Sequence, residues 1–405
     1  MTHDDELIAF LSTQRLGPHS DGMMASMGMP WRQLPSWDDL EIVERPSTLS
    51  GDDSAIGTTL VLGASKAKPL RLAIPLIVSD MSFGSLSMAA KIALAAGAES
   101  AGTAICSGEG GILAEEIAES HHYIYELGSG EFGFAPSEFY PTPLWHKAQA
   151  FHFKGGQAAK TGTGGHLPAE KVTQRIARTR GRPVGEAIIS PPTFTTMRSV
   201  RDFKDRIDQV QEKLGGVPIG FKLSANHIRA DIDFALEMGV DYIILDGRGG
   251  STGAAPILFR DHISIPTIPA LVEARQVLDQ RGASGRVKLI ATGSLRVPTD
   301  FVKALALGAD GIALANAALQ AVGCIGTRQC HTNLCPTGIA TQDPYFTPKF
   351  TGKGEQLRRF LANSVRVMQR IARQCGHATL SDFTRNDLET PSRELARLTG
   401  VRHAG

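Results

Sequence analysis

From residue 72 onward, the chain alternates short apolar runs rich in Val, Ile and Leu with longer amphipathic segments. Each apolar run ends in Gly, Ser or Asp, a pattern typical of parallel strands joined by crossover helices. The runs predict eight strands, at residues 72–81, 103–106, 186–190, 218–223, 242–246, 266–270, 287–291 and 311–315. Eight such strands predict an α/β fold of the closed (β/α)8 TIM-barrel type.

The segments between these runs indicate how the barrel is covered. Residues 200–214 and 274–281 carry apolar positions three and four apart, so we expect them to form helices of the outer ring. Residues 107–185 are rich in Gly, Ser, aromatic and His residues and are much longer than an ordinary connection. We therefore predict a long insertion after the second strand that builds a binding site.

The chain of 405 residues exceeds the roughly 250 residues of a single barrel, so segments must be added to it. We predict an N-terminal extension over 1–70, at the barrel bottom or in contact with a partner, with weak strands at 40–43 and 58–62. The barrel itself is predicted over 71–342. A C-terminal extension over 343–405 should contain a helix whose apolar face includes Leu357, Leu361, Val365, Met368 and Ile371. Cys375 is expected to pack in the core beside that face.

Composition and charge restrict the partners. The chain is 42% hydrophobic and 20% charged, its formal charge is only +1, and it has no long Lys/Arg run. We therefore expect small-molecule and protein partners, with no nucleic acid and no membrane. No secretory signal and no apolar stretch of about 18–20 residues is visible, so a cytoplasmic location is expected. An odd number of cysteines, five in all, also fits a reducing compartment.

Three cysteines lie within twelve residues near the C-terminal end, at Cys324, Cys330 and Cys335. Thiolates hold iron–sulfur clusters, and a proline beside the last cysteine is usual in such runs. Three thiolates favour a three-iron cluster. Two alternatives stay open: zinc held by the cysteines and His331, or ordinary buried cysteines.

Active sites of barrel enzymes lie at the C-terminal ends of the strands, so the residues after each apolar run are candidates. Gly293 and Ser294 allow backbone N–H groups to approach a phosphate, and residues 246–253 add a second glycine-rich turn. Lys222 lies on a predicted strand, where an unpaired charge is costly. A lysine there is suited to stabilising the reduced ring of a flavin.

Several motifs together resemble the FMN-binding domain of glutamate synthases, especially the short, stand-alone archaeal-type proteins. They extend over roughly residues 70–345, and their order and spacing make chance a poor explanation. The motifs are Met81-Ser82-Phe83-Gly84, Ser107-Gly108-Glu109-Gly110-Gly111, Gln157-Ala158-Ala159-Lys160, Gly164-Gly165-His166-Leu167-Pro168, Gly250-Ser251-Thr252-Gly253-Ala254 and the run from Cys335 to Gln342.

The resemblance implies an FMN and 3Fe–4S oxidoreductase that forms, or in reverse oxidises, a C–N bond, as in conversion of 2-iminoglutarate to glutamate. It further implies an amino or oxo acid substrate, electrons from ferredoxin or a flavoprotein, partner glutaminase or amine-transfer subunits, and a homo- or hetero-oligomer. The implied catalytic residues are Lys160, Glu109 and Gln157, and the implied substrate-binding residues are Lys154, His166, Arg180 and Glu131. FMN would be bound by Met81, Ser82, Ser107, Lys222, Gly253, Gly293, Ser294 and Asn316, and the cluster by Cys324, Cys330 and Cys335.

Two segments depart from the family pattern. Glu131 stands where the family usually has arginine, and residues 193–197 replace a His- and Asp-containing segment. Because glutamate repels a carboxylate, a pocket-facing Glu131 would put 2-oxoglutarate in doubt. These departures leave three alternatives: a specialised relative acting on another amino acid or amine within a multi-subunit complex, a non-catalytic electron-relay subunit, and a flavin-dependent 2-hydroxy-acid oxidase or isomerase.

Overall fold

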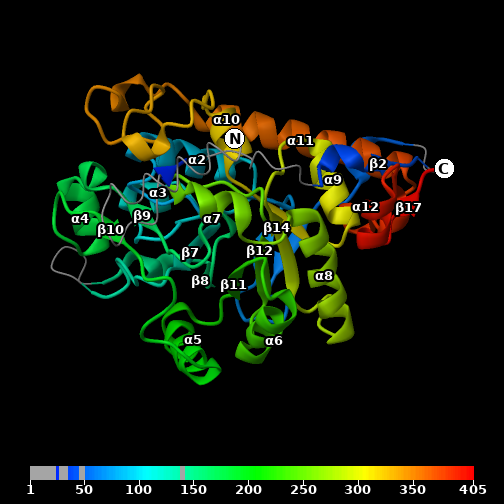
Figure 1. The fold of residues 1–405 in the computed structure, drawn as a ribbon, viewed down its shortest axis with the longest axis horizontal. Helices are drawn as coiled ribbons and strands as arrows, with labels where there is room; N and C mark the ends of the chain where they lie inside the picture. The colour runs from blue at the N-terminus through cyan, green and yellow to red at the C-terminus, as the bar shows by residue number, and fades with distance from the viewer. Residues whose placement is uncertain (1–23, 27–34, 45–50, 137–141) are drawn as a thin grey trace.

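A computed structural model describes residues 24–26, 35–44, 51–136 and 142–405 of the chain. Eight parallel strands form a closed barrel, and strands consecutive around the barrel are also consecutive along the chain (Figure 1). The predicted (β/α)8 barrel is therefore confirmed. Its strands are β5 (Leu76–Val78), β6 (Ile105–Cys106), β7 (Tyr123–Leu127), β8 (Ala150–Lys154), β11 (Ile219–Ser224), β12 (Tyr242–Asp246), β14 (Lys288–Thr292) and β15 (Gly311–Leu314).

Two of the eight predicted strands are not strands of the barrel. Residues 266–270 begin the helix α8 (Thr267–Gln280), and residues 186–190 contain β10 (Ile188–Ile189), which pairs outside the barrel with β9 (His166–Leu167). A short apolar run is consistent with a buried strand or with the buried face of a helix, so periodicity alone could not separate them.

The two missed barrel strands, β7 and β8, lie within the stretch interpreted as an insertion after the second strand. That interpretation needs correction: the long excursion follows β8 and extends to the start of β11. It contains the short β9–β10 ribbon, the helix α4 (Gln174–Arg180) and α5 (Val200–Leu214).

Local sequence signals explain where the outer helices begin and end. Ser199 and Asp202 form a capping box at the start of α5, and Gly215 ends that helix with φ = +70°, a left-handed conformation that favours glycine. The predicted helix at 200–214 is thus confirmed. The other helices around the barrel are α2 (Met88–Ser100), α3 (Ala114–Ala118), α6 (Ile228–Met238), α7 (Ile257–His262), α9 (Pro298–Ala306) and α10 (Asn316–Ala321).

A hairpin closes the bottom of the barrel. Strands β3 (Leu60–Leu62) and β4 (Leu70–Leu72) pair antiparallel, and their leucines share one buried cluster with inward-facing barrel side chains such as Tyr242 and Ile290. This placement agrees with the predicted barrel-bottom position of part of the N-terminal extension. Residues 1–23, 27–34 and 45–50 of that extension lie outside the described residues.

The C-terminal extension packs along the barrel as the long helix α11 (Gly354–Gln374), followed by α12 (Arg393–Thr399) (Figure 1). Four residues of the predicted apolar face, Leu357, Leu361, Val365 and Met368, are buried, as is Cys375. The two extensions meet in a sheet where β16 (Leu388–Thr390) joins β2 (Glu41–Ile42) to β17 (Arg402–His403). None of the helices described here is both long and apolar enough to cross a membrane.

Candidate active site

A cavity of about 130 Å³ opens at the C-terminal ends of the strands. It is lined by residues that follow β5, β6, β8, β12 and β15, and by all three cysteines of the C-terminal run. A smaller cavity of about 30 Å³ lies beside it at the ends of β14 and β15. The two cavities share Asp80, Gln157, Ser251, Ala315 and Asn316, so they form one continuous site from the barrel mouth to the cysteines.

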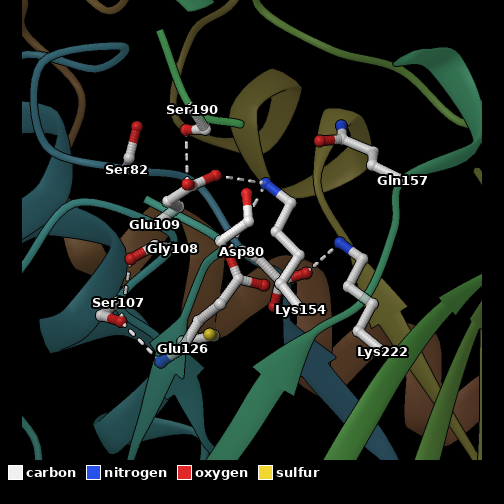
Figure 2. Close-up of polar contacts among 12 residues, drawn as sticks. Asp80, Ser82, Ser107, Gly108, Glu109, Glu126, Lys154, Gln157, Ser190 and Lys222 are labelled. Carbon is white, nitrogen blue, oxygen red and sulfur yellow. Dashed lines mark hydrogen bonds and ion pairs between the residues drawn. The ribbon is translucent and has the colours of Figure 1, made fainter. Parts of the chain in front are cut away.

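Glu109, Lys154 and Ser190 form a buried hydrogen-bonded group on one side of the cavity (Figure 2). Lys154 Nζ donates to Glu109 Oε2 at 3.1 Å, and Ser190 Oγ donates to Glu109 Oε1 at 2.5 Å. Burial alone would raise the pKa of Glu109, but Lys154 and Ser190 together lower it to about 2. Glu109 is therefore a carboxylate at neutral pH, and the pKa of Lys154 is raised because Glu109 and Glu126 outweigh its burial.

Lys222 lies at the floor of the site, on β11, and forms an ion pair with Asp80, which follows β5. Both side chains are 4% exposed. Burial disfavours both charges, yet their mutual attraction is larger, so the pKa of Asp80 is lowered and that of Lys222 is raised. The strand lysine predicted from the sequence is thus a charged, paired residue facing the cavity.

Lys160 differs from the other two lysines because it pairs with no carboxylate among the described residues. Its amino group donates only a long hydrogen bond of 3.4 Å to the Ala254 carbonyl oxygen. Burial, reinforced by the neighbouring charge of Lys154, lowers the pKa of Lys160 to about 7. Lys160 is therefore the amine that can exchange a proton near neutral pH.

Two buried residues that sequence reasoning missed lie below these charges. His152 on β8 lies 3.1 Å from Glu126 Oε2 on β7 and 3.6 Å from Asp80 Oδ1, measured from its Nε2. Its Nδ1 lies 3.2 Å from the Tyr242 hydroxyl. The apolar runs at residues 123–127 and 150–154 could have revealed both side chains, since Glu126 and His152 each interrupt a run of apolar and aromatic residues.

Arg180 crosses the cavity wall from the end of α4. It donates from one terminal nitrogen to Ser82 Oγ at 3.2 Å and to the Phe83 carbonyl at 3.0 Å, and its buried Nε has no hydrogen-bond partner. Burial lowers its pKa to about 10, so the guanidinium remains charged. Gln157 and His166 also line the cavity, and Gln157 donates to the Ser251 carbonyl.

Glu131 lies outside this cavity. It lines a separate hollow near Phe132 and Trp145, accepts a hydrogen bond from Thr196 at 3.0 Å and forms an ion pair with Arg206 at 3.2 Å. No residue of 193–197 lines the cavity either; Phe194 and Met197 are buried in the core. The two departures from the family pattern therefore give no reason to expect a changed pocket.

We expect Glu131→Gln to leave the KM for the substrate within about twofold and to cost less than about 1 kcal/mol of unfolding free energy, as for other partly exposed ion pairs. Steady-state kinetics and urea unfolding measure the two effects. A KM that falls severalfold on removing this negative charge would mean that Glu131 does face the substrate.

Ser107 supports the site from behind and lines neither cavity. Its hydroxyl accepts a hydrogen bond from the Glu126 amide at 3.0 Å, which ties β6 to β7. Lys91, buried in α2, donates to the carbonyls of Met81 and Ser107 and forms a 2.7 Å ion pair with Glu116. Lys91 thus fixes the two loops that carry Met81, Ser82 and Glu109 into the cavity.

We expect Lys91→Met to cost about 3 kcal/mol of unfolding free energy, the lower end for loss of one partner of a buried ion pair. Burial already raises the pKa of Glu116 to about 7, so this carboxyl can take up a proton when its partner is removed. The cost should therefore be larger at pH 8 than at pH 6 in urea unfolding. The double variant Lys91→Met/Glu116→Gln should recover part of the loss; equal costs at both pH values would contradict this account.

The smaller cavity is lined by a glycine turn and by charges of both signs, with Asp80 and Asp246 beside Lys222 and Arg296. Gly293, with φ = +120°, and Ser294 form its rim, and the partly buried Arg296 and the buried Lys222 contribute positive charge. A Cβ atom at Gly293 would lie 2.4 Å from Thr267 Oγ1, and one at Gly250 would lie 2.4 Å from Asp246 Oδ1, so both turns require glycine. Closely packed glycine turns and fixed cations fit the phosphate and polar ring edge of FMN.

The cysteine loop is held in place by residues distant in sequence. Ser26 Oγ accepts from the Cys330 amide at 3.1 Å and donates to the Arg328 carbonyl at 2.5 Å. Lys171, 2% exposed, donates to the Cys330 carbonyl at 2.9 Å. Burial raises the pKa of Cys335, but hydrogen bonds from Thr337 and nearby backbone amides outweigh it and lower the pKa below the usual value. Burial raises the pKa of Cys324 and raises that of Cys330 to about 11, so the fit to an anionic cluster depends on the buried Lys171 and on the three thiols lining one cavity.

The same loop fits zinc poorly. Among the described residues, one group of at least three Cys, His, Asp and Glu side chains has its ligand atoms close enough, within 4.8 Å of one another, to hold a single metal ion. That group contains none of the three cysteines of the loop. A single zinc ion at about 2.3 Å from each sulfur needs the sulfurs closer together than that. A multi-iron cluster spans a wider set of thiolates.

A family model described as a conserved region in glutamate synthase matches residues 36–378. The archaeal-type glutamate synthase (NADPH) of Thermotoga maritima is 37% identical over 293 residues, which cover 72% of this chain and 57% of that protein. A glutamate synthase large subunit-like protein of Rhizobium meliloti is 32% identical over 397 residues, which cover 92% of this chain and 88% of that one. This chain spans little more than half the length of its archaeal-type relatives.

Solved structures with a similar fold include a flavocytochrome b2 variant with pyruvate bound, at a TM-score of 0.54 and 15% identity, covering 91% of this chain and 79% of that one. A mandelate oxidase variant with a monooxide FMN adduct matches at a TM-score of 0.51 and 14% identity, covering 85% of this chain and 86% of that one. At these identities the likeness shows a shared barrel fold.

Proposed function

The chain belongs to the glutamate synthase family, and from that premise we propose that it is an FMN and 3Fe–4S oxidoreductase that reduces 2-iminoglutarate to glutamate. 2-Oxoglutarate and ammonia lose water to give the imine, and the imine takes up two electrons and two protons to give the amino acid. The site must therefore bind a dicarboxylate, exclude water and deliver a proton to nitrogen.

One observation supports this proposal most strongly: the cavity holds more positive charge than its own carboxylates neutralise. Five Lys and Arg side chains and three Asp and Glu side chains line it, and neither Lys160 nor Arg180 forms an ion pair with a carboxylate among the described residues. Buried cations are costly without an anionic partner. A dicarboxylate substrate supplies that partner, and the planar guanidinium of Arg180 suits a carboxylate in particular.

When bound, FMN supplies two-electron chemistry to the substrate carbon, and the cluster supplies single electrons from outside. Met81, Ser82, Lys222, Gly253, Gly293, Ser294 and Asn316 are proposed to hold FMN. Cys324, Cys330 and Cys335 are proposed to hold the cluster. The proposed FMN residues and the three cysteines line one continuous cavity, so the two assignments are compatible with a single site.

The side chains of the protein itself are proposed to transfer the proton and to position the substrate. Lys160 is proposed as the general acid, because its pKa of about 7 gives a substantial fraction of ammonium at neutral pH. Glu109 stays ionised and orients Lys154, which can hold the substrate carboxylate or carbonyl oxygen. Gln157 is held by its hydrogen bond to the Ser251 carbonyl, and it restricts where the reacting carbon of the substrate can lie.

A flavin-dependent 2-hydroxy-acid oxidase shares the barrel, but nothing in that chemistry requires cysteines in the cavity wall. A pure electron relay would not require Lys160, Glu109 and Arg180 to converge in one cavity. Ferredoxin or a flavoprotein is proposed as electron donor, and free ammonia, a glutaminase or an amine-transfer subunit as nitrogen source.

Anaerobically purified protein tests the proposal. We expect a flavin spectrum, iron bound to the protein, and oxidation of the photoreduced flavin when 2-oxoglutarate and ammonia are added together, with glutamate detected by chromatography. 2-Oxobutyrate, which lacks the distal carboxylate, is the matched control and should react far more slowly. Equal rates with both oxo acids, or flavin reduction by 2-hydroxy acids, would contradict the proposal.

A further inference from the structure

Four buried side chains with metal-binding atoms meet inside the barrel, below the lysines of the candidate site. Their ligand atoms lie within 4.8 Å of one another, and they belong to Asp80, Cys106, Glu126 and His152. Figure 2 shows two of them, Asp80 and Glu126, close together inside the barrel. The chemistry proposed above requires neither Cys106 nor His152, so the reason for this cluster lies elsewhere.

Each of four consecutive barrel strands contributes one ligand. Asp80 follows β5, Cys106 ends β6, and Glu126 and His152 lie on β7 and β8. Hydrogen bonding between the first three of these strands is sparse. β5 pairs with β6 at one residue pair and β6 pairs with β7 at two, whereas β11 and β12 pair at five. A single ion bound to all four side chains would therefore join strands whose own hydrogen-bond ladders are short.

The spacing of the ligand atoms suits a four-coordinate ion. His152 Nε2 lies 3.1 Å from Glu126 Oε2 and 3.6 Å from Asp80 Oδ1. The same nitrogen lies 3.8 Å from Cys106 Sγ. Tetrahedral zinc ligands, at about 2.0–2.3 Å from the metal, lie about 3.3–3.8 Å from one another. One N–H group cannot donate to two carboxylates and a sulfur at once, whereas an ion placed between them contacts all three and the nitrogen.

The two carboxylates each turn one oxygen toward the cluster and the other toward a lysine of the site. Asp80 Oδ2 forms the ion pair with Lys222, and Glu126 Oε1 lies 3.8 Å from Lys154 Nζ. Glu126 Oε1 is buried and has no hydrogen-bond partner among the described residues. Carboxylates that bind a metal usually have such outer partners. An ion in the cluster would therefore fix the carboxylates that position Lys154 and Lys222 at the cavity.

The histidine is oriented to bind a metal through Nε2. The Tyr242 hydroxyl donates to the Phe151 carbonyl oxygen at 3.3 Å, so the hydroxyl oxygen, 3.2 Å from His152 Nδ1, accepts a hydrogen bond from Nδ1–H. Without a metal, Nε2 carries a second proton because it faces two carboxylate oxygens. Zinc would replace that proton and the thiol proton of Cys106. Two positive charges then leave as two arrive, and the net charge of the cluster is unchanged.

We propose that one zinc ion is bound by Asp80, Cys106, Glu126 and His152. Thiolate and imidazole ligands favour zinc over magnesium or calcium, and four protein ligands with no open position are typical of a structural zinc site. All four side chains are buried, and Asp80 and Glu126 also line the main cavity, which gives the ion a path of entry. The site requires neither the substrate nor the electron donor proposed above.

Zinc and iron analysis of the full-length protein, grown in zinc-supplemented medium and purified anaerobically, tests the proposal. Cys106→Ser removes the sulfur ligand but keeps a hydroxyl that can donate to Asp80, as the thiol does. Cys375→Ser is the matched control, because Cys375 is also buried and its Sγ lies 3.7 Å from the Val43 carbonyl oxygen. X-ray absorption at the zinc edge identifies the ligand atoms in the wild-type protein.

We expect about one zinc ion per wild-type chain in addition to iron, with one sulfur at about 2.3 Å and the other ligands, nitrogen or oxygen, at about 2.0–2.2 Å. Cys106→Ser should lower the zinc content by about tenfold or more and keep its iron. Cys375→Ser should keep both metals. If Cys106→Ser does not fold, the absorption spectrum of the wild-type protein decides the question without it.

Wild-type protein that holds no zinc, or zinc bound by three sulfur atoms, would overturn the inference; the second result would place zinc at the cysteine loop. Full zinc content in Cys106→Ser would also contradict it, and the four side chains would then form a hydrogen-bonded network alone. The proposed function fails on different results: a protein with zinc but with neither flavin nor iron would refute the oxidoreductase and leave the zinc site standing.

Discussion

Replacing Lys160 by methionine is expected to lower the turnover number by about 10²–10⁴-fold, the range for loss of a positioned general acid. Methionine keeps the length and apolar stem of the side chain but removes its proton. Wild-type turnover should fall as pH rises through about 7, because the ammonium form of Lys160 is then lost. Glutamate formation measured at constant free ammonia concentration checks both effects.

The same substitution should stabilise the protein at low pH. The pKa of Lys160 is about 7 in the folded protein and about 10.4 in an unfolded chain, so folding disfavours the ammonium form. The resulting cost is fully present below pH 7 and declines between pH 7 and about 10, because the unfolded chain then binds more protons than the folded one. Lys160→Met should therefore raise the unfolding free energy most at pH 6.

Urea unfolding of Lys160→Met at pH 6 and pH 9 measures this change in unfolding free energy. Lys204→Met, at an exposed position of α5, is the matched control and should change the unfolding free energy little at either pH. A variant that remains fully active, or that loses stability at pH 6, would show that Lys160 is a structural cation with a partner of its own.

Cys330→Ser and Cys335→Ser are each expected to abolish bound iron, since a three-iron cluster has no spare protein thiolate. Iron analysis and the visible spectrum of anaerobically purified protein measure the loss. Cys375→Ser is the matched control: Cys375 is 3% exposed and its Sγ lies 3.7 Å from the Val43 carbonyl oxygen, far along the chain from the cysteine loop. This control should keep its iron.

Flavin content should survive in both cysteine variants, because the proposed FMN residues lie at or after the ends of β5, β11, β12, β14 and β15 and none belongs to the cysteine loop. Photoreduced variants should still reduce the imine, whereas reduction by ferredoxin should be lost. Zinc in place of iron in the wild-type protein, or full iron content in both variants, would remove the proposed electron path.

The amino-acid sequence by itself determined the features that depend on local pattern. Apolar periodicity predicted the closed barrel and six of its strands, and the glycine turn at 293–294 and the cysteines at 324, 330 and 335 were visible as spacings. Apolar positions three and four apart placed α5 correctly. These features could be predicted because backbone geometry and thiolate spacing are set by residues that are close along the chain.

Tertiary structure alone decided which charges meet. Lys222 pairs with Asp80 across 142 positions and Lys154 with Glu109 across 45, while Lys160 is left with only a weak backbone contact. It also turned Glu131 toward Arg206, away from the cavity where the sequence pattern had placed it. Pairing and burial set a side chain's charge and pKa, and both depend on barrel strands brought together by closure of the sheet. A linear pattern can name the residues of such a site, but only the closed barrel shows which of them holds an exchangeable proton.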